Sequence, residues 1–178
     1  MLPSNVTATR IHEAKRLKEE GNNLFREGSF RKARILYSKV FAYINGLVPD
    51  GGLMQYSSAL GKIPPTEQET HQIQDLRVSC YSNIAMCYLK LEDYEHVEEY
   101  CNKTLEIDEN HVKSHYRKGV AFACRNRLDA ARKSLEMAMQ LDPQNSAAKK
   151  ELVNVKHRIR LSDERSNKKL AQALSGAI

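Results

Sequence analysis

The 178-residue chain contains no tryptophan and few helix-breaking residues, with only 8 glycines and 5 prolines. More than half of these breakers lie between positions 46 and 65, so the long segments on either side can form uninterrupted helices. No run of 18 apolar residues occurs, which argues against a membrane-spanning helix. The N-terminus also lacks the apolar core of a signal peptide, and we expect no membrane partner.

Cysteine is scarce as well, and its spacing is uninformative for metal binding. The four cysteines form neither a CxxC pair nor a zinc-ligand pattern: Cys80, Cys87, Cys101 and Cys124. We therefore expect a reducing compartment, the cytoplasm or also the nucleus. Cys87 and Cys101 fall at inward positions of the repeat described below, so we interpret them as small core residues.

Signals for catalysis are missing too. No glycine-rich phosphate loop occurs. His111 and His115 stand four residues apart without the glutamate of an HExxH motif, and we interpret them as core or rim histidines. The sequence thus predicts a protein that is not an enzyme and that holds no cofactor and no metal.

The charge is unevenly distributed along the chain. Lys and Arg number 28 against 22 Asp and Glu, a formal charge of +6. Basic segments at 1–45 and 112–178 flank an acidic centre at 46–111. A nucleic-acid-binding face is more uniformly basic, so we expect no nucleic acid partner. Attraction between oppositely charged neighbouring helices explains the pattern, although exposed pairs contribute little.

A repeat of 34 residues is visible inside the chain. Residues 112–143 align with residues 78–109, and residues 14–41 align with both after 30 inserted residues. Small residues recur at the eighth position, as Gly21, Ala85 and Gly119. A period of 34 is that of the tetratricopeptide repeat (TPR), a pair of amphipathic helices. Small residues at positions eight and twenty let the two helices approach closely, and bulky residues at positions four, eleven and twenty-four fill the gaps.

We expect an all-α fold, a right-handed TPR superhelix of three helix-turn-helix repeats with an extended C-terminal capping helix. The expected order is a flexible N-terminus (1–9), three repeats within 10–145 (10–45, 66–109 and 112–143), a loop inserted after the first repeat (46–65), a capping helix (146–174) and a disordered tail (175–178). Thr66 and Glu69 form a capping-box pattern, so a helix should run from near residue 67 to Leu91. The loop is either a tolerated surface excursion or functional.

The concave side of a TPR superhelix is lined by the first helix of each repeat, on which positions 2, 5, 6 and 9 share one face. In repeat order, these positions hold Lys15, Lys18, Glu19 and Asn22, then Ser79, Ser82, Asn83 and Met86, then Lys113, Tyr116, Arg117 and Val120. The stripe is basic at both ends and amide-polar in the middle. We expect Lys15, Met86, Tyr116 and Val120 to line the groove.

Two pairs on this stripe are each one helical turn apart, Lys18 with Asn22 and Lys113 with Arg117. With Asn83 between them, they can seat two carboxylates close together. A peptide that ends in aspartate offers such a pair, its main-chain and its side-chain carboxylate. Charge-assisted hydrogen bonds contribute roughly 1.5–3 kcal/mol each. After the entropic cost of ordering a flexible tail is subtracted, these bonds predict micromolar binding, with a free energy of about −8 kcal/mol.

These five positions resemble the clamp of co-chaperone TPR domains, which bind the Glu-Glu-Val-Asp tail of heat-shock proteins 90 and 70. KEEGN (18–22), NIAMCYLKL (83–91) and HYRKG (115–119) look like segments of the large immunophilin co-chaperones. The stretches INGLVP, VEEYCNK and RKGVAF, with the length and the insertion, more closely resemble the tetratricopeptide repeat protein 9 subfamily. The resemblance covers residues 10–160.

The resemblance implies a monomeric adaptor that binds the acidic C-terminal peptide of heat-shock protein 90 or 70 through Lys18, Asn22, Asn83, Lys113 and Arg117, and that can recruit an additional client protein. The closing proline of the repeat is present as Pro143, but Glu109 replaces it in repeat two. Fewer than about 15 residues precede the repeats, so we expect no immunophilin isomerase domain.

Three other interpretations stay open. The five residues can be a solvated polar face, and the repeats a scaffold for a helix or an extended segment of a non-chaperone partner. The basic segment 147–174 can bind lipid or calmodulin. We favour a capping helix for this segment, because its apolar stripe, Leu152, Val155 and Ile159, is followed by a fully polar stretch.

Overall fold

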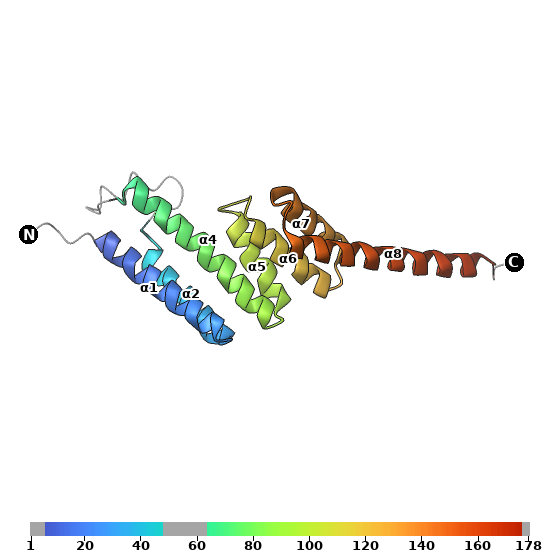
Figure 1. The fold of residues 1–178 in the computed structure, drawn as a ribbon, viewed down its shortest axis with the longest axis horizontal. Coiled ribbons are helices and arrows are strands. Elements are labelled where there is room, and N and C mark those ends of the chain that lie inside the picture. Colours follow the sequence, from blue (N-terminus) through green and yellow to red (C-terminus); the bar gives the residue numbers. More distant parts are fainter. Residues whose placement is uncertain (1–5, 48–63, 176–178) are drawn as a thin grey trace, which may run out of the picture. The chain divides into compact units, whose positions relative to one another are not determined.

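A computed structural model describes residues 6–47 and 64–175 of the chain. Within these ranges it contains seven helices and no strand, which confirms the all-α class (Figure 1). The helices are α1 (Val6–Arg26), α2 (Phe30–Ile44), α4 (Glu67–Lys90), α5 (Tyr94–Leu105), α6 (Val112–Cys124), α7 (Leu128–Leu141) and α8 (Ser146–Ser175). They form two compact units, which we call the first unit (Met1–Glu109) and the second unit (Asn110–Ile178). Most of the expected loop 46–65 lies outside the described residues.

Small residues at the eighth repeat position allow the paired helices to touch, as the repeat pattern predicts. A Cβ atom on Gly21 would lie 2.7 Å from Cε1 of Tyr37, and one on Gly119 would lie 2.6 Å from Cγ of Leu135. Neither distance is sterically possible for a real side chain without displacing the partner. Each glycine therefore faces the twenty-fourth residue of its own repeat, on the second helix of the pair.

The core of the first unit is built by α1, α2 and α4, which all pack on one another. Its buried residues come from all three helices: Ile11, Ala14, Leu17, Ala33, Tyr37, Val40, Ile44, Ile73, Leu76, Cys80, Ile84 and Cys87. Cys87 and Cys101 are fully buried, which confirms their interpretation as core residues. Helix α5 packs on α4 and completes the second repeat.

Helix α4 begins three turns before the repeat itself, at Glu67. Its N-cap is Thr66, whose side chain accepts a hydrogen bond from the backbone N–H of Glu69 while the Glu69 carboxylate accepts one from the Thr66 backbone N–H. This confirms the predicted capping box. The additional turns are part of the core, because Ile73 and Leu76 are buried in the same cluster as Ile11 and Ile44.

Helix α1 starts earlier than predicted. It begins at Val6, so residues 6–9, which we expected in a flexible N-terminus, are helical. Arg10 supplies a physical reason, because its guanidinium donates hydrogen bonds to the backbone oxygens of Ala42 (3.2 Å) and Asn45 (3.5 Å) at the end of α2. These bonds hold the first turns of α1 and also satisfy carbonyl groups at a helix C-terminus.

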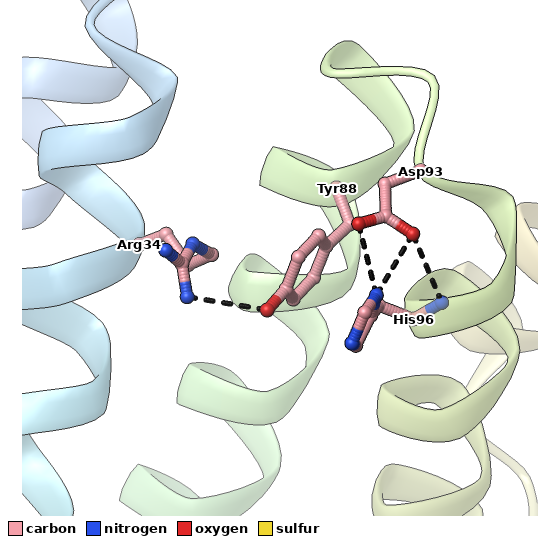
Figure 2. A network of polar contacts seen from close by, with 4 residues as sticks. All are labelled: Arg34, Tyr88, Asp93 and His96. Carbon is pink, nitrogen blue, oxygen red and sulfur yellow. Dashed lines mark hydrogen bonds and ion pairs between the residues drawn. The ribbon is translucent and has the colours of Figure 1, made fainter.

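A polar network holds α2 against the corner between α4 and α5 (Figure 2). Arg34 donates a hydrogen bond to the Tyr88 hydroxyl (3.1 Å), and the Tyr88 ring stacks on His96 at 4.7 Å between centroids. Asp93, the N-cap of α5, accepts a bond from Nδ1 of His96 at 2.8 Å. Since a carboxylate only accepts, Nδ1 carries the hydrogen. The network thus connects α2 of the first repeat to both helices of the second repeat.

In the second unit, α8 covers the apolar side of α7 and reaches α6. Val155 of α8 is fully buried with Phe122, Ala123, Ala131 and Leu135, and Leu152 and Ile159 pack against this cluster. From Ser162 onward every described residue of α8 is exposed, and the helix projects beyond α7 (Figure 1). None of the described helices combines the length and the apolarity needed to cross a membrane.

Candidate functional site

Three of the five predicted clamp residues come together in the first unit. Lys18 and Asn22 lie one turn apart on α1, and Asn83 lies on α4. The side-chain amide of Asn83 donates a hydrogen bond to Oδ1 of Asn22 at 3.3 Å. The Tyr37 hydroxyl of α2 donates to the same oxygen at 2.8 Å. Two donors thus fix the orientation of the Asn22 amide, whose NH₂ group must point the other way.

The NH₂ group of Asn22 points to a carboxylate. It donates to Oε2 of Glu19 at 3.2 Å, while Nζ of Lys18 lies 3.6 Å from Oε1 of Glu19. The Glu19 side chain is 60% exposed, so this contact is loosely held at the surface. Lys18 and Asn22 therefore already bind one carboxylate group, although it belongs to the chain itself. This is the chemistry that we expect of them toward a ligand.

Two neighbouring residues shape the surroundings of this carboxylate site. Lys15 donates a hydrogen bond to Oε1 of Gln72 on α4 at 2.8 Å, which ties it across the two helices. Met86 is partly buried on α4. Below the surface, burial raises the pKa of the Cys80 thiol to about 12, and the positive charge of Lys18 opposes this rise. The Lys18 ammonium is therefore close enough to the neutral, buried Cys80 thiol to influence it.

The other two clamp residues, Lys113 and Arg117, lie one turn apart on α6 in the second unit, about 6 Å along the helix axis. Lys113 is exposed and Arg117 is partly buried. Helix α6 begins after His111, whose ring nitrogen accepts a hydrogen bond from the backbone N–H of Ser114 at 3.3 Å. His111 is therefore a helix cap. The two cations lie in the first turns of this helix, where the dipole already favours an anion.

Tyr116 and Val120, which we expected to line the groove, are both partly buried on α6. The Tyr116 ring packs against the core of the second unit, so it serves packing as well. Burial raises the pKa of its hydroxyl, the nearby Glu151 carboxylate raises it further, and the charge of Arg117 opposes both. Tyr116 stays a neutral hydrogen-bonding group beside Arg117.

Periodicity alone gave no role to two residues that contact Asn22, which are Tyr37 and Glu19. Tyr37 occupies the twenty-fourth repeat position, where the other repeats carry Cys101 and Leu135. A buried tyrosine hydroxyl needs a partner, and that requirement was the available signal. Glu19 stood on the predicted stripe, but no pattern shows that its carboxylate turns toward Lys18 and Asn22.

Among residues 6–47 and 64–175, no three His, Cys, Asp or Glu side chains are grouped so that they could hold a metal ion. In the first unit, Lys18, Asn22, Asn83 and Tyr37 supply an ammonium, two amides and a hydroxyl. In the second unit, taken by itself, Lys113 and Arg117 supply an ammonium and a guanidinium.

The described residues have a tetratricopeptide repeat fold, and comparison with known proteins shows that the chain is similar to the tetratricopeptide repeat domains of co-chaperones. A tetratricopeptide repeat profile matches residues 78–111, which is the second repeat. The bovine (Bos taurus) peptidyl-prolyl cis-trans isomerase FKBP4 is 32% identical over 159 residues, which cover 89% of this chain and 31% of that protein. The chain thus spans about a third of the length of this relative.

Solved structures agree with this class. The C-terminal TPR-containing domain of a Plasmodium falciparum FK506-binding protein has a TM-score of 0.73 at 23% identity, with 89% of this chain and 95% of that chain covered. The Hsp90 co-chaperone Cns1 of Saccharomyces cerevisiae has a TM-score of 0.70 at 28% identity, with 93% of this chain and 45% of that chain covered.

Some of the structural neighbours hold chaperone peptides. The first TPR domain of Spaghetti (RPAP3), solved with the HSP90 peptide SRMEEVD, has a TM-score of 0.63 at 21% identity over 84% of this chain and 94% of that chain. The second TPR domain of human RPAP3, solved with the HSP70 peptide SGPTIEEVD, has a TM-score of 0.59 at 23% identity over 84% and 98%. Both peptides end in Glu-Glu-Val-Asp.

Proposed function

We propose that this chain is a co-chaperone adaptor whose groove binds the acidic C-terminal Glu-Glu-Val-Asp tail of heat-shock protein 90 or 70. One observation carries the proposal: Lys18 and Asn22 hold a carboxylate, that of Glu19, with Asn22 oriented by Tyr37 and Asn83. A ligand carboxylate can replace Glu19 on the same donors. The peptide-bound structural neighbours support the choice of ligand.

In this proposal, the terminal aspartate is bound by a two-carboxylate clamp. Lys18, Asn22 and Asn83 donate to one carboxylate, and Lys113 and Arg117 donate to the other, with Tyr116 beside Arg117. Each charge-assisted bond contributes roughly 1.5–3 kcal/mol before ordering of the tail is subtracted. We expect a dissociation constant of about 1 μM, equivalent to about −8 kcal/mol.

We also place the chain nearest to the tetratricopeptide repeat protein 9 subfamily, on the stretches INGLVP, VEEYCNK and RKGVAF. As an adaptor, it would bring an additional client to the chaperone as a monomer, in the cytoplasm or the nucleus. Isomerase activity belongs to the bovine relative as a whole protein, of which this chain spans about a third, and we do not assign it to this chain.

Isothermal titration with the peptide Met-Glu-Glu-Val-Asp tests the proposal. Binding should be micromolar and should weaken as salt rises, because the contacts are between charges. One extra residue after the aspartate should abolish binding, and Lys113→Ala or Arg117→Ala should weaken it at least roughly tenfold. Lys133→Ala is the matched control, since Lys133 is an exposed lysine on α7 of the same unit. No binding, or binding indifferent to Arg117→Ala, favours the scaffold for a non-chaperone partner.

A further inference from the structure

A second cationic hollow lies in the second unit, between the α6–α7 turn and the projecting half of α8. Its volume is about 470 Å³, and its lining consists of Asn126, Leu128, Arg158, Leu161, Ser162, Arg165, Ser166 and Lys169. Three of these residues are cations, three carry neutral polar groups, and none is acidic. The residues of the proposed clamp, Lys113 and Arg117, do not line it.

The three cations of the hollow share one face of α8, although the helix carries other cations on its remaining faces. Positions 158, 162, 165 and 169 recur at i, i+4, i+7 and i+11, which is a single stripe of an α-helix. The nearby acidic residues Asp163 and Glu164 fall outside this stripe, and Glu164 pairs with Arg160 at 3.5 Å. Neither of the two carboxylates in the projecting half of α8 therefore lies on the face of the hollow.

One end of the hollow is fixed by hydrogen bonds. Arg158 donates to the backbone oxygen of Ala123 and to Oδ1 of Asn126, both at 3.0 Å. Asn126 adopts a left-handed backbone conformation with φ of 58°, and its N–H donates to the oxygen of Ala123 at 3.1 Å. These bonds tie α8 to the turn, so that the rest of the stripe stands in a defined position over Asn126 and Leu128.

The other polar groups of the hollow have no partner of their own. Within the described part of the chain, Arg165 and Lys169 make no hydrogen bond and no ion pair, and neither do the hydroxyls of Ser162 and Ser166. Two cations and two hydroxyls on successive turns of one helix face are thus available to a ligand that carries several acceptors.

The length of the stripe identifies the ligand class. From Arg158 to Lys169 the helix rises about 16 Å, which is too long for a single phosphate and equals about five residues of extended peptide. The exposed Leu170 and Leu174 stand outside the stripe, among Asn167 and Asp163, so no continuous apolar face accompanies the cations as membrane binding requires. We propose that this hollow binds an extended acidic segment of a partner protein, by its side-chain carboxylates and without need of a free C-terminus.

The probe is acetyl-pentaglutamate amide, which has no C-terminal carboxylate for the clamp. In a titration followed by ¹⁵N NMR, we expect saturable shifts at the backbone amides of Asn126 and Leu128. Arg165→Gln/Lys169→Gln should weaken binding roughly five- to tenfold. The control Lys156→Gln/Arg160→Gln removes the same charge from the opposite face of α8, where Lys156 and Arg160 pair with Glu136 and Glu164, and should retain affinity within about twofold.

Two further ligands separate the sources of negative charge. Inositol hexakisphosphate and phosphatidylserine vesicles are titrated against the same variants. Binding of either one, but not of the peptide, overturns the proposal in favour of a phosphate or a membrane ligand, and equal losses in both double variants overturn it in favour of a diffuse charge effect. The shifts at Asn126 and Leu128 report binding at the hollow, and the clamp is tested separately with Met-Glu-Glu-Val-Asp, so failure of the clamp does not affect this result.

Discussion

At the scale of single residues, Asn22 is the side chain on which the most contacts of the candidate site converge. Its Oδ1 accepts from both Tyr37 and Asn83, and its NH₂ group donates to Glu19. The spacing of one helical turn predicted that Lys18 and Asn22 share a face. The orientation of the amide could not be predicted, because it depends on a hydroxyl from another helix.

Tyr37→Phe removes one of the two donors to Asn22. We expect the free energy of unfolding to fall by about 1 kcal/mol and the affinity for Met-Glu-Glu-Val-Asp to fall several-fold, because the Asn22 amide is then held by Asn83 alone. Chemical denaturation and titration calorimetry measure the two effects. Tyr43→Phe removes a hydroxyl that makes no hydrogen bond in the described chain and should change neither. Equal effects of the two variants contradict the assigned role.

In the proposed clamp, Glu19→Gln should raise the affinity for Met-Glu-Glu-Val-Asp, whereas Tyr37→Phe lowers it. The Glu19 carboxylate competes with the ligand for Lys18 and Asn22 and repels an incoming anion, so we expect the neutral variant to bind the peptide roughly two- to fivefold more tightly at low salt. Glu20→Gln is the matched control, since Glu20 pairs with Arg16. If the unmodified chain binds the peptide and Glu19→Gln leaves its affinity unchanged, the Glu19 carboxylate does not compete with the peptide.

At the scale of elements, helix pairs are held by the fit of a glycine against a large side chain. Gly21→Ala and Gly119→Ala should each lower the free energy of unfolding by about 1–2 kcal/mol, although alanine favours an isolated helix, because the new methyl group meets Tyr37 or Leu135. Urea denaturation measures the loss. Gly119→Ala combined with Leu135→Ala should show positive coupling, since the smaller residue makes room. Additive losses would argue against the contact.

Helix α8 divides into a part that packs and a part that projects. Every described residue that truncation after Leu161 removes is exposed, so the free energy of unfolding should change by less than about 0.5 kcal/mol. Truncation after Asn145 also removes the buried Val155. It should lower the free energy of unfolding by more than about 3 kcal/mol, because Phe122 and Leu135 become exposed to solvent. Thermal denaturation of the two shortened chains distinguishes these outcomes. A large loss after the shorter truncation contradicts the division.

The elements were predictable from the sequence to an unequal degree. The 34-residue period located the paired helices, and Thr66 with Glu69 located the start of α4, because both are local patterns. The start of α1 at Val6 was missed, since it depends on Arg10 reaching the end of α2, more than 30 residues away. The anchoring of α8 by Arg158 to Asn126 was missed for the same reason.

At the scale of the whole molecule, the buried Cys80 thiol makes the free energy of unfolding depend on alkaline pH. Burial raises the pKa of Cys80 from 9.0 to about 12, so the folded chain keeps a proton that the unfolded chain releases. The stability that this represents is complete below pH 9 and is lost as the pH rises toward 12. Denaturation between pH 8 and 11 should show a decline in the free energy of unfolding. Cys80→Ala should reduce its slope, and substitution of the exposed Cys124 by Ala should not.

The side chains at the eighth and twenty-fourth positions of a repeat are matched in size, and this matters for the design of longer repeat arrays. Gly21 stands against Tyr37, Gly119 stands against Leu135, and the middle repeat has the larger Ala85 with the smaller Cys101. Grafting the first helix of the middle repeat in place of that of the third would bring an alanine against Leu135. A longer array made by copying units of this chain therefore requires whole helix pairs, with both positions transferred together.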